Sequence, residues 1–325
     1  MISTRFTELV GCSIPIQQAA IGGLATPALA TAVAQAGGLG MVCMYWSPPK
    51  VIEKVLDELR EQTSGVFGAN FIMRSVDPAL ANESVAAAAE RAGIVEFFYT
   101  DPNPSLIEIV HAGGALACWQ VGSRAEAITA VDAGCDFIIA QGIEAGGHVR
   151  GRIGLLALLD EVLKAVDVPV LAAGGIGTGR RMAAVLAAGA DGVRVGTRFV
   201  GSEEAEAHPQ YVNALIAAEA EDTVYTEAFS NGWPNAPHRV LRSCIEAAEA
   251  FEGDVVGEDQ PLFIGGRTPI HRFQPLTIGK KVTGAIETMP HWAGESVDGV
   301  KKVQPAAEIV QELVDECEEY LQRWK

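Results

Sequence analysis

A single histidine stands in the glycine-rich stretch QGIEAGGHVRG, residues 141–151, directly after the apolar run CDFIIA. Gly146 and Gly147 leave the side chain of His148 uncrowded and allow unusual backbone angles. Glu144 lies four residues earlier, where it either orients the imidazole or is solvated. The sequence has no second histidine or cysteine at metal-ligand spacing and no G-x-S-x-G elbow, so neither a metal site nor a hydrolase triad is expected. We therefore expect His148 to transfer a proton or to hydrogen-bond a substrate. The alternative is that His148 lies on a surface loop and has no part in the chemistry.

Two further glycine-rich stretches each end an apolar run: AAGGIGTGRR at 172–181 and VRVGTRF at 193–199. Glycines let backbone N–H groups approach phosphate oxygens, and the start of a following helix adds a positive dipole end. We therefore predict a phosphate site, with ligand-free tight turns as the alternative. GGIGTG lacks the dinucleotide spacing, so no NAD-binding domain is expected. The residues predicted at the phosphate are Gly174, Gly175, Gly177, Gly196 and Thr197.

Three neutral amides also close apolar runs: Asn70, Gln120 and Gln141. Each amide both donates and accepts hydrogen bonds. Any one of them could equally cap a turn. Gathered around one opening, they favour a flat heteroaromatic cofactor with alternating donors and acceptors.

The elements that must position these residues form an irregular repeat of an Ala-rich helical stretch, Ala-Gly and a short apolar strand. Strands without polar alternation are typical of a parallel sheet buried on both faces. Eight β/α units in roughly 200 residues predict a TIM (β/α)8 barrel, with an open doubly wound sheet as the alternative. The strands are expected within 13–19, 32–43, 65–71, 86–99, 111–120, 130–142, 168–175 and 185–196.

The character of the sequence changes after about residue 218. We predict a barrel domain over 1–218, then an excursion over 219–274 that forms a lid or wall on the active-site face. Residues 275–325 are predicted to pack back on the barrel and to end in an amphipathic helix. Contact with a substrate is considered for three residues of the excursion, although packing on the barrel is favoured for each. They are Trp233, His238 and Phe263.

The overall composition excludes several classes of partner. Lys and Arg number 24 against 41 Asp and Glu, a net charge of −17 that argues against nucleic acid and against an anionic membrane surface. The six cysteines form no C-x-x-C pair, which is typical of a reducing compartment. No signal peptide and no run of about 18 apolar residues is present, so a cytoplasmic protein is expected. A homodimer is considered, without a predicted interface.

The histidine loop and the paired glycine loops together resemble the nitronate monooxygenase family, formerly called 2-nitropropane dioxygenases. These are FMN-dependent TIM-barrel enzymes, grouped with flavin-dependent enoyl-ACP reductases and NADH:quinone reductases. The stretches that carry the resemblance are IPIQQAAIGGLATPALATAVAQAGGLG (14–40), GANF (68–71), QGIEAGGHVRG (141–151), PVLAAGGIGTGRRMAAVLAAGADGVRVGTRF (169–199) and HWAGES (291–296).

The resemblance implies FMN as the cofactor and His148 as the catalytic histidine. The flavin phosphate is then expected at Gly174, Gly175, Gly196 and Thr197. The other cofactor-binding positions are expected at Ala20, Ile21, Gly22, Asn70, Gln120, Gln141 and Gly146.

Two positions depart from the family pattern. Ala20 and Ile21 stand where the family often has Pro-Met or Gly-Met, so backbone contacts to the flavin can survive while the pocket changes shape. Gln120 stands where many relatives have a lysine, so we expect one cation fewer near the flavin.

The activity implied by the resemblance is oxidation of an alkyl nitronate or nitroalkane by O2 to a carbonyl compound and nitrite. His148 would hydrogen-bond the nitro group or act as the base. The alternative is an NAD(P)H-dependent reductase of a quinone or an enoyl thioester. A second alternative is a flavin- or acyl-binding accessory module without turnover. No residue in the sequence decides between the two enzymatic activities, and Ala20-Ile21 and Gln120 leave the accessory module open.

Overall fold

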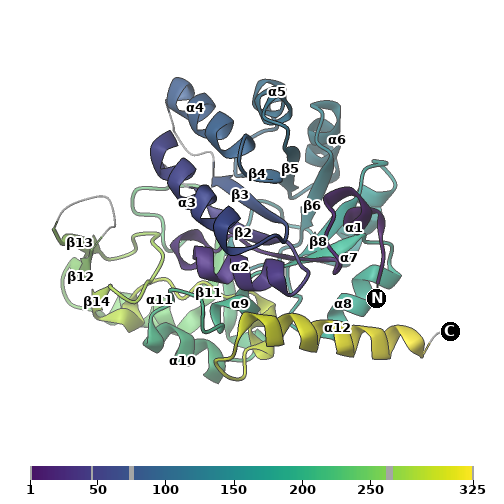
Figure 1. Cartoon of the computed structure of the whole chain (residues 1–325). Coiled ribbons are helices and arrows are strands. Elements are labelled where there is room, and N and C mark those ends of the chain that lie inside the picture. The colour runs from purple at the N-terminus through teal and green to yellow at the C-terminus, as the bar shows by residue number, and fades with distance from the viewer. Residues whose placement is uncertain (1, 45–46, 73–76, 261–265, 324–325) are drawn as a thin grey trace.

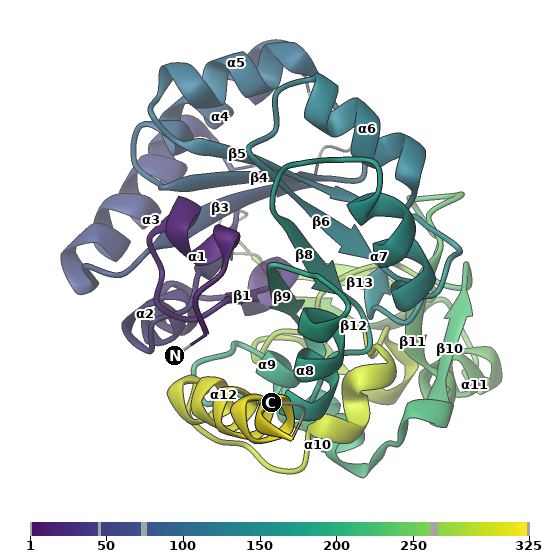
Figure 2. The ribbon, with the colours of Figure 1, turned by 90° about the vertical axis from the view of Figure 1, so that its right-hand side faces the viewer.

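Eight parallel strands form one sheet in the computed structural model, which describes residues 2–44, 47–72, 77–260 and 266–323. The strand order is β1-β9-β8-β6-β5-β4-β3-β2, and a bridge from Gln17 to Leu39 joins the two ends (Figures 1 and 2). The predicted TIM barrel is therefore confirmed. The strands are β1 (Ile16–Gln18), β2 (Gly40–Cys43), β3 (Phe67–Ile72), β4 (Ile94–Phe98), β5 (Leu116–Val121), β6 (Phe137–Gln141), β8 (Val170–Ala173) and β9 (Gly192–Val195).

Helices cover the outside of the barrel and begin where the sequence signals a start. In α2, for example, Pro27 occupies the first turn and the Thr26 hydroxyl accepts a hydrogen bond from the Leu29 N–H at 3.1 Å. The helices around the barrel are α2 (Pro27–Gln35), α3 (Pro49–Gln62), α4 (Pro78–Ala89), α5 (Pro104–Ala112), α6 (Arg124–Asp132), α7 (Leu155–Leu163) and α8 (Gly179–Ala187). The others are α1 (Arg5–Val10), α9 (Thr197–Val200), α10 (Pro209–Ala217), α11 (Arg242–Ala250) and α12 (Ala306–Gln322).

The interior of the barrel is apolar at its N-terminal end. There α1 closes the opening, and Phe6 meets Phe137 edge-on with ring centroids 5.4 Å apart. Leu39, Met41 and Leu171 belong to the same buried cluster. This packed base leaves the opposite, C-terminal end of the strands as the place for polar side chains, as is usual in this fold.

Two small antiparallel sheets stand beside the barrel. In one, β11 (His238–Leu241) pairs with β10 (Thr223–Thr226) and with β7 (Gly147–His148), so it ties the histidine loop to the excursion. The other consists of β12 (Val255–Asp259), β13 (Thr268–His271) and β14 (Thr283–Gly284). The 3-10 helices are η1 (Gly22–Leu24), η2 (Ala220–Asp222), η3 (Ile286–Thr288) and η4 (Glu295–Gly299).

The C-terminal helix α12 packs along α8 and α2, as Figures 1 and 2 show. Its buried side includes Ile309, Leu313 and Cys317, the apolar face of the predicted amphipathic helix. Among the described residues, no helix has the length and apolarity needed to cross a membrane.

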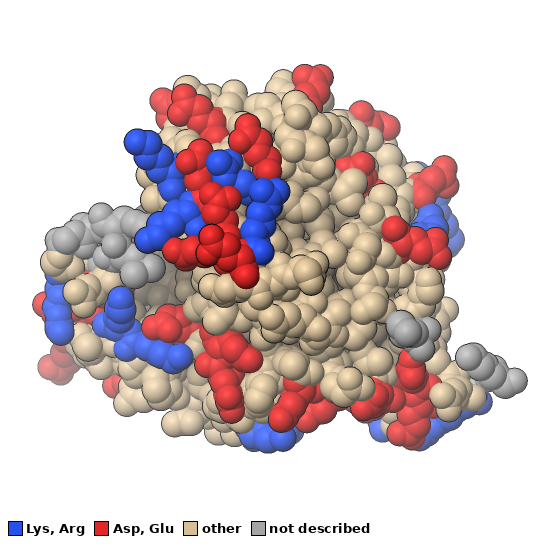
Figure 3. Space-filling view, viewed as in Figure 1, with Lys and Arg blue, Asp and Glu red and all other residues tan. Residues whose placement is uncertain are grey.

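Cations and carboxylates are mixed on the face shown in Figure 3, where α3 and α4 pack. Arg91 lies within 4 Å of carboxylates from Glu53, Asp57 and Glu90. The described residues of this face therefore form no continuous basic patch.

Candidate active site

Five polar side chains fill the C-terminal end of the barrel, and we name them the polar layer. They are Gln17, Asn70, Glu96, Gln120 and Arg194, from β1, β3, β4, β5 and β9. The fully buried Glu96 carboxylate accepts hydrogen bonds from Gln17 Nε2 at 2.7 Å, Asn70 Nδ2 at 2.7 Å and Arg194 Nη2 at 2.6 Å. Arg194 Nη1 donates to Gln120 Oε1. A cation from β9 thus lies against Gln120, the position at which one cation fewer than in many relatives is expected.

Neither Glu96 nor Arg194 was singled out from the sequence, although a signal was present. Each is a lone charge inside an apolar strand, in VEFF and in VRVG. Burial raises the pKa of the Glu96 carboxyl group, while the positive charge of Arg194 and the amide hydrogen bonds oppose that effect. A charge buried in this way is stable only with such partners.

Beside the polar layer, the glycine loops line a hollow that is open to solvent on one side, which we name the glycine hollow. Gly174 and Gly175 have φ angles of 107° and 68°, so a side chain at either position would strain the backbone. The residues that line it are Ala19, Gln141, Ala145, Gly146, Ala173, Gly174, Gly175, Ile176, Arg194, Gly196, Thr197 and Ser296.

Most of the predicted phosphate residues meet in the glycine hollow, together with Gln141 and Gly146. Gly177 is not among the lining residues, because it packs on the C-terminal segment, where an added Cβ would lie 2.5 Å from Ser296 O. Asn70 and Gln120 belong to the polar layer. Three predicted positions do not line the hollow but follow the lining residue Ala19 in the segment between β1 and η1 or at the start of η1. They are Ala20, Ile21 and Gly22.

Gly146 also has a packing role. A Cβ added to it would lie 2.4 Å from the Gly294 backbone nitrogen, within the HWAGES stretch. The Gly294 N–H donates to Thr197 Oγ1 at 3.1 Å. The close approach of the two glycines thus joins the histidine loop, the β9 loop and the C-terminal segment around one hollow.

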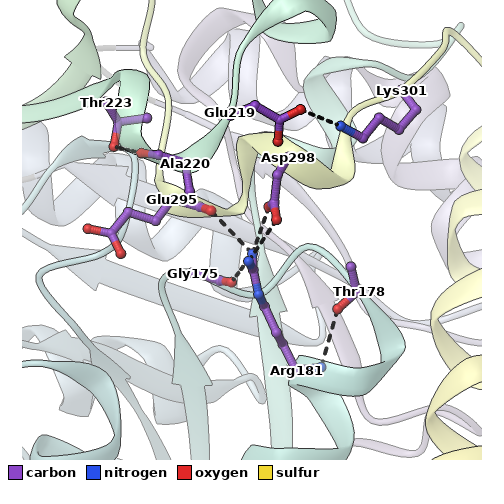
Figure 4. A network of polar contacts seen from close by, with 9 residues as sticks. All are labelled: Gly175, Thr178, Arg181, Glu219, Ala220, Thr223, Glu295, Asp298 and Lys301. Carbon is purple, nitrogen blue, oxygen red and sulfur yellow. Dashed lines mark hydrogen bonds and ion pairs between the residues drawn. The ribbon is translucent and has the colours of Figure 1, made fainter.

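Arg181 clamps the loop after β8, as Figure 4 shows. Its Nη1 donates to Gly175 O at 3.1 Å, to Glu295 O at 3.2 Å and to Asp298 Oδ1 at 2.8 Å. Its Nη2 donates to Asp298 Oδ2 at 2.7 Å. The guanidinium of α8 therefore fixes one glycine of the hollow to η4. Sequence reasoning missed this residue because two of its partners, Glu295 and Asp298, lie more than a hundred positions away.

The His148 side chain lies among four other rings, which we name the ring enclosure. The centroid distances from the imidazole are 4.0 Å to Trp233, 5.4 Å to Tyr99, 5.4 Å to Trp292 and 5.7 Å to His238. The sequence favours simple packing on the barrel for Trp233 and His238, whereas both contact the histidine of interest. Phe263 lies outside the described residues.

His238 is held in its neutral form. Its Nε2 accepts a hydrogen bond from the Phe229 N–H at 3.2 Å, so the proton is on Nδ1, which donates to Ala236 O at 2.9 Å. Burial also lowers the pKa of this imidazole. His238 thus acts as a fixed wall beside His148.

Tyr99 and Glu144 have roles that spacing alone did not indicate. Tyr99 directly follows β4 with a φ of 66°, a strained angle for an aromatic residue, and its ring reaches both His148 and Trp233. The Glu144 carboxylate accepts hydrogen bonds from the Leu155 N–H at 2.9 and 3.0 Å. Glu144 therefore caps α7, a role different from the predicted orientation of the imidazole or simple solvation.

The nitronate monooxygenase family model matches residues 3–316 of the chain. The chain belongs to the nitronate monooxygenase family. A probable nitronate monooxygenase of Staphylococcus aureus (strain N315) is 28% identical over 361 residues, covering 98% of both chains. A (3aS,4S,5R,7aS)-5-hydroxy-7a-methyl-1-oxo-octahydro-1H-indene-4-carboxyl-CoA dehydrogenase of Rhodococcus jostii (strain RHA1) is 33% identical over 261 residues, covering 79% of this chain and 70% of that protein.

Two solved structures extend this likeness to the fold. FabK from Thermotoga maritima has a TM-score of 0.82 and 29% identity, covering 100% of this chain and 99% of its own. The nitroalkane oxidase from Streptomyces ansochromogenes has a TM-score of 0.79 and 27% identity, covering 99% of this chain and 100% of its own. This nitronate monooxygenase family member is therefore a flavin-dependent oxidoreductase, so the alternative of a non-catalytic module is set aside.

The residues at the hollow fit a flavin nucleotide. Two buried polar atoms there have no hydrogen-bond partner among the described residues: the acceptor Gln141 Oε1 and the donor Arg194 Nε. A ring that carries both N–H and C=O groups matches such a pair. Gly174 and Gly175 line the hollow without side chains, so that their backbone can approach a phosphate. In the part of the chain that the structure describes, no group of three or more His, Cys, Asp or Glu side chains could hold a metal ion.

Proposed function

We propose that the chain is an FMN-dependent enzyme that oxidises alkyl nitronates, with O2 as oxidant, to a carbonyl compound and nitrite. The observation that carries the proposal is the position of Gln141 between two parts of the site. Its Nε2 donates to His148 O at 3.0 Å, the residue also lines the glycine hollow, and its buried Oε1 has no hydrogen-bond partner among the described residues. A cofactor contacted by Gln141 would therefore lie next to β7, the strand that carries His148.

When bound, FMN supplies the redox chemistry. The glycine loops would hold its phosphate, and Gln141 and Arg194, which line the same hollow, would hold its ring. His148 hydrogen-bonds the nitro oxygen of a nitronate, or takes the proton from the carbon of a neutral nitroalkane. Trp233 and Trp292 lie against the imidazole, which remains partly exposed at this opening.

Anaerobic mixing with a nitronate tests this proposal. The flavin absorbance of the wild type should bleach, and His148→Ala should slow that step by at least about a hundredfold. His111→Ala is the matched control, because His111 is an exposed histidine that pairs with Asp136 before β6, at the other end of the barrel. Unchanged reduction of the flavin in His148→Ala would remove His148 from the mechanism.

A second candidate function is flavin-dependent redox chemistry on a thioester. It is favoured by the 33% identity to the carboxyl-CoA dehydrogenase of Rhodococcus jostii. The same anaerobic experiment separates the two candidates when nitronate, acyl-CoA, NADH and NADPH are mixed with the enzyme in parallel. Flavin reduction by acyl-CoA or a nicotinamide, with none by nitronate, would replace the first proposal with the second.

A further inference from the structure

Arg194 is the one charged residue among the described residues that line the glycine hollow. It lies on β9, in register with Gln17 of β1 and Ala173 of β8, and its side chain is only 11% exposed. Taking a cation out of water is costly unless its partners compensate for the lost hydration. The sequence therefore places an expensive charge at the spot where the cofactor ring is expected.

The guanidinium is held in a fixed orientation. Nη2 donates to Glu96 and Nη1 donates to Gln120, so both ends of the guanidinium fork face the interior of the polar layer. Glu96 is itself held by Gln17 and Asn70. Arg194 is thus pre-organised by four other side chains before any ligand arrives.

One donor of this guanidinium is left over. Arg194 Nε is buried and has no partner among the described residues. A buried ion pair that served the fold alone could be replaced by apolar packing, and it would gain nothing from an unsatisfied N–H. An open donor beside Gln141 Oε1, a buried open acceptor on the same hollow, points to a ligand that contacts both.

We propose that Arg194 is a positioning residue for the flavin ring, and that its charge stabilises the negative charge that the ring gains on reduction. The inference rests on the proposed FMN site but not on nitronate as the substrate. Glu96 and Gln120 fix the direction of the guanidinium. Gln120 is neutral where many relatives have a lysine, but in this chain it accepts a hydrogen bond from the arginine proposed to serve the cofactor.

Sulfite provides a test that needs no substrate. It adds to the oxidised flavin by forming a bond from its sulfur to N5, and the displaced electron pair moves into the ring, which becomes anionic. In the FMN-loaded protein, Arg194→Gln should raise the Kd of sulfite by roughly tenfold or more, while Arg194→Lys should stay near the wild type. The two-electron potential should fall with it, by about 30 mV for each tenfold change in the equilibrium.

Arg150→Gln is the matched control. Arg150 is also paired with two carboxylates, Asp101 and Glu126, but it does not line the glycine hollow. It should leave the sulfite Kd and the potential close to the wild-type values. An FMN-loaded Arg194→Gln variant with wild-type sulfite affinity and potential would overturn the proposal.

If Arg194→Gln does not retain FMN, the proposal is tested on the wild type through the spectrum of its reduced flavin. Beside a fixed cation, the reduced bound flavin should keep the spectrum of its N1-deprotonated form from mildly alkaline to mildly acidic pH. The spectrum of the protonated form at mildly acidic pH would overturn the proposal. If the sulfite results are as expected but the enzyme does not oxidise nitronates, only the proposed substrate is contradicted. If the wild type binds no FMN, the proposed cofactor is contradicted.

Discussion

Replacing Arg181 by methionine should weaken FMN binding without unfolding the barrel. Methionine keeps the stem of the side chain and a good helix propensity for α8. The substitution removes the hydrogen bonds to Gly175 O and Glu295 O and the two-bond contact with Asp298. The loop that carries Gly175, the proposed phosphate loop, is then no longer tied to η4.

The magnitude follows from the exposure of the contact. The Arg181 and Asp298 side chains are 37% and 26% exposed, so their ion pair is partly screened by solvent. Allowing for that screening, the ion pair and the two carbonyl contacts together hold the loop by about 2–3 kcal/mol. If that energy is spent on ordering the loop for the phosphate, the Kd of FMN should rise by about 30- to 150-fold.

FMN titration of the apoprotein, followed by flavin fluorescence, measures the effect. Arg180→Met is the matched control, because Arg180 precedes Arg181 on the same helix but contacts Tyr320 of α12. A double-mutant cycle with Asp298→Asn should show that the two single losses are not additive. Wild-type FMN affinity in Arg181→Met, or fully additive losses, would refute the reasoning.

Three further predictions concern stability and substrate binding. Burial lowers the pKa of His291 to about 4, so below about pH 6.5 the unfolded chain takes up a proton that the folded state excludes. Between pH 7 and pH 4 this proton should lower the free energy of unfolding, measured with urea, by roughly 3 kcal/mol. The His291→Gln variant should lack that part of the decrease. Gly146→Ala should lower the free energy of unfolding by about 1–3 kcal/mol, because the added Cβ would clash with Gly294. Gly23→Ala should be close to neutral, because its added Cβ meets no atom of the described residues within 4 Å; equal losses in the two variants would contradict this account. Trp233→Ala should raise the KM for the substrate, because it removes the ring that lies against the proposed catalytic histidine. Trp233→Phe keeps an aromatic ring there and should have a KM close to that of the wild type. An unchanged KM in both variants would mean that Trp233 serves packing alone.

Local patterns in the sequence were enough to predict the barrel. Runs that are mostly apolar and lack alternation marked most of the eight strands, because a strand buried on both faces needs no polar side; β1, with Gln17 and Gln18, is the exception. Pro27 marked a helix start for a reason that depends on its own backbone alone. The glycine loops were also readable, since the requirement for a φ of 107° at Gly174 is a property of one residue.

Only the tertiary structure decided which side chains meet. Glu96 and Arg194 are 98 positions apart, and they pair because the closed strand order points both into one end of the barrel. Trp233 reaches His148 because β11 pairs with β7. Such partners depend on how distant elements pack, and the type and local spacing of a residue do not contain that information.

The same reason explains where interpretation from the sequence fell short. Glu144 has the spacing to reach His148, but its carboxylate caps α7 through Leu155. Gln120 alone indicates a missing cation, yet Arg194 from another strand lies against it. Residue types and strand ends thus determined that a polar, glycine-rich opening exists, while the packing of the closed barrel decided which charge lies in it and what each side chain faces.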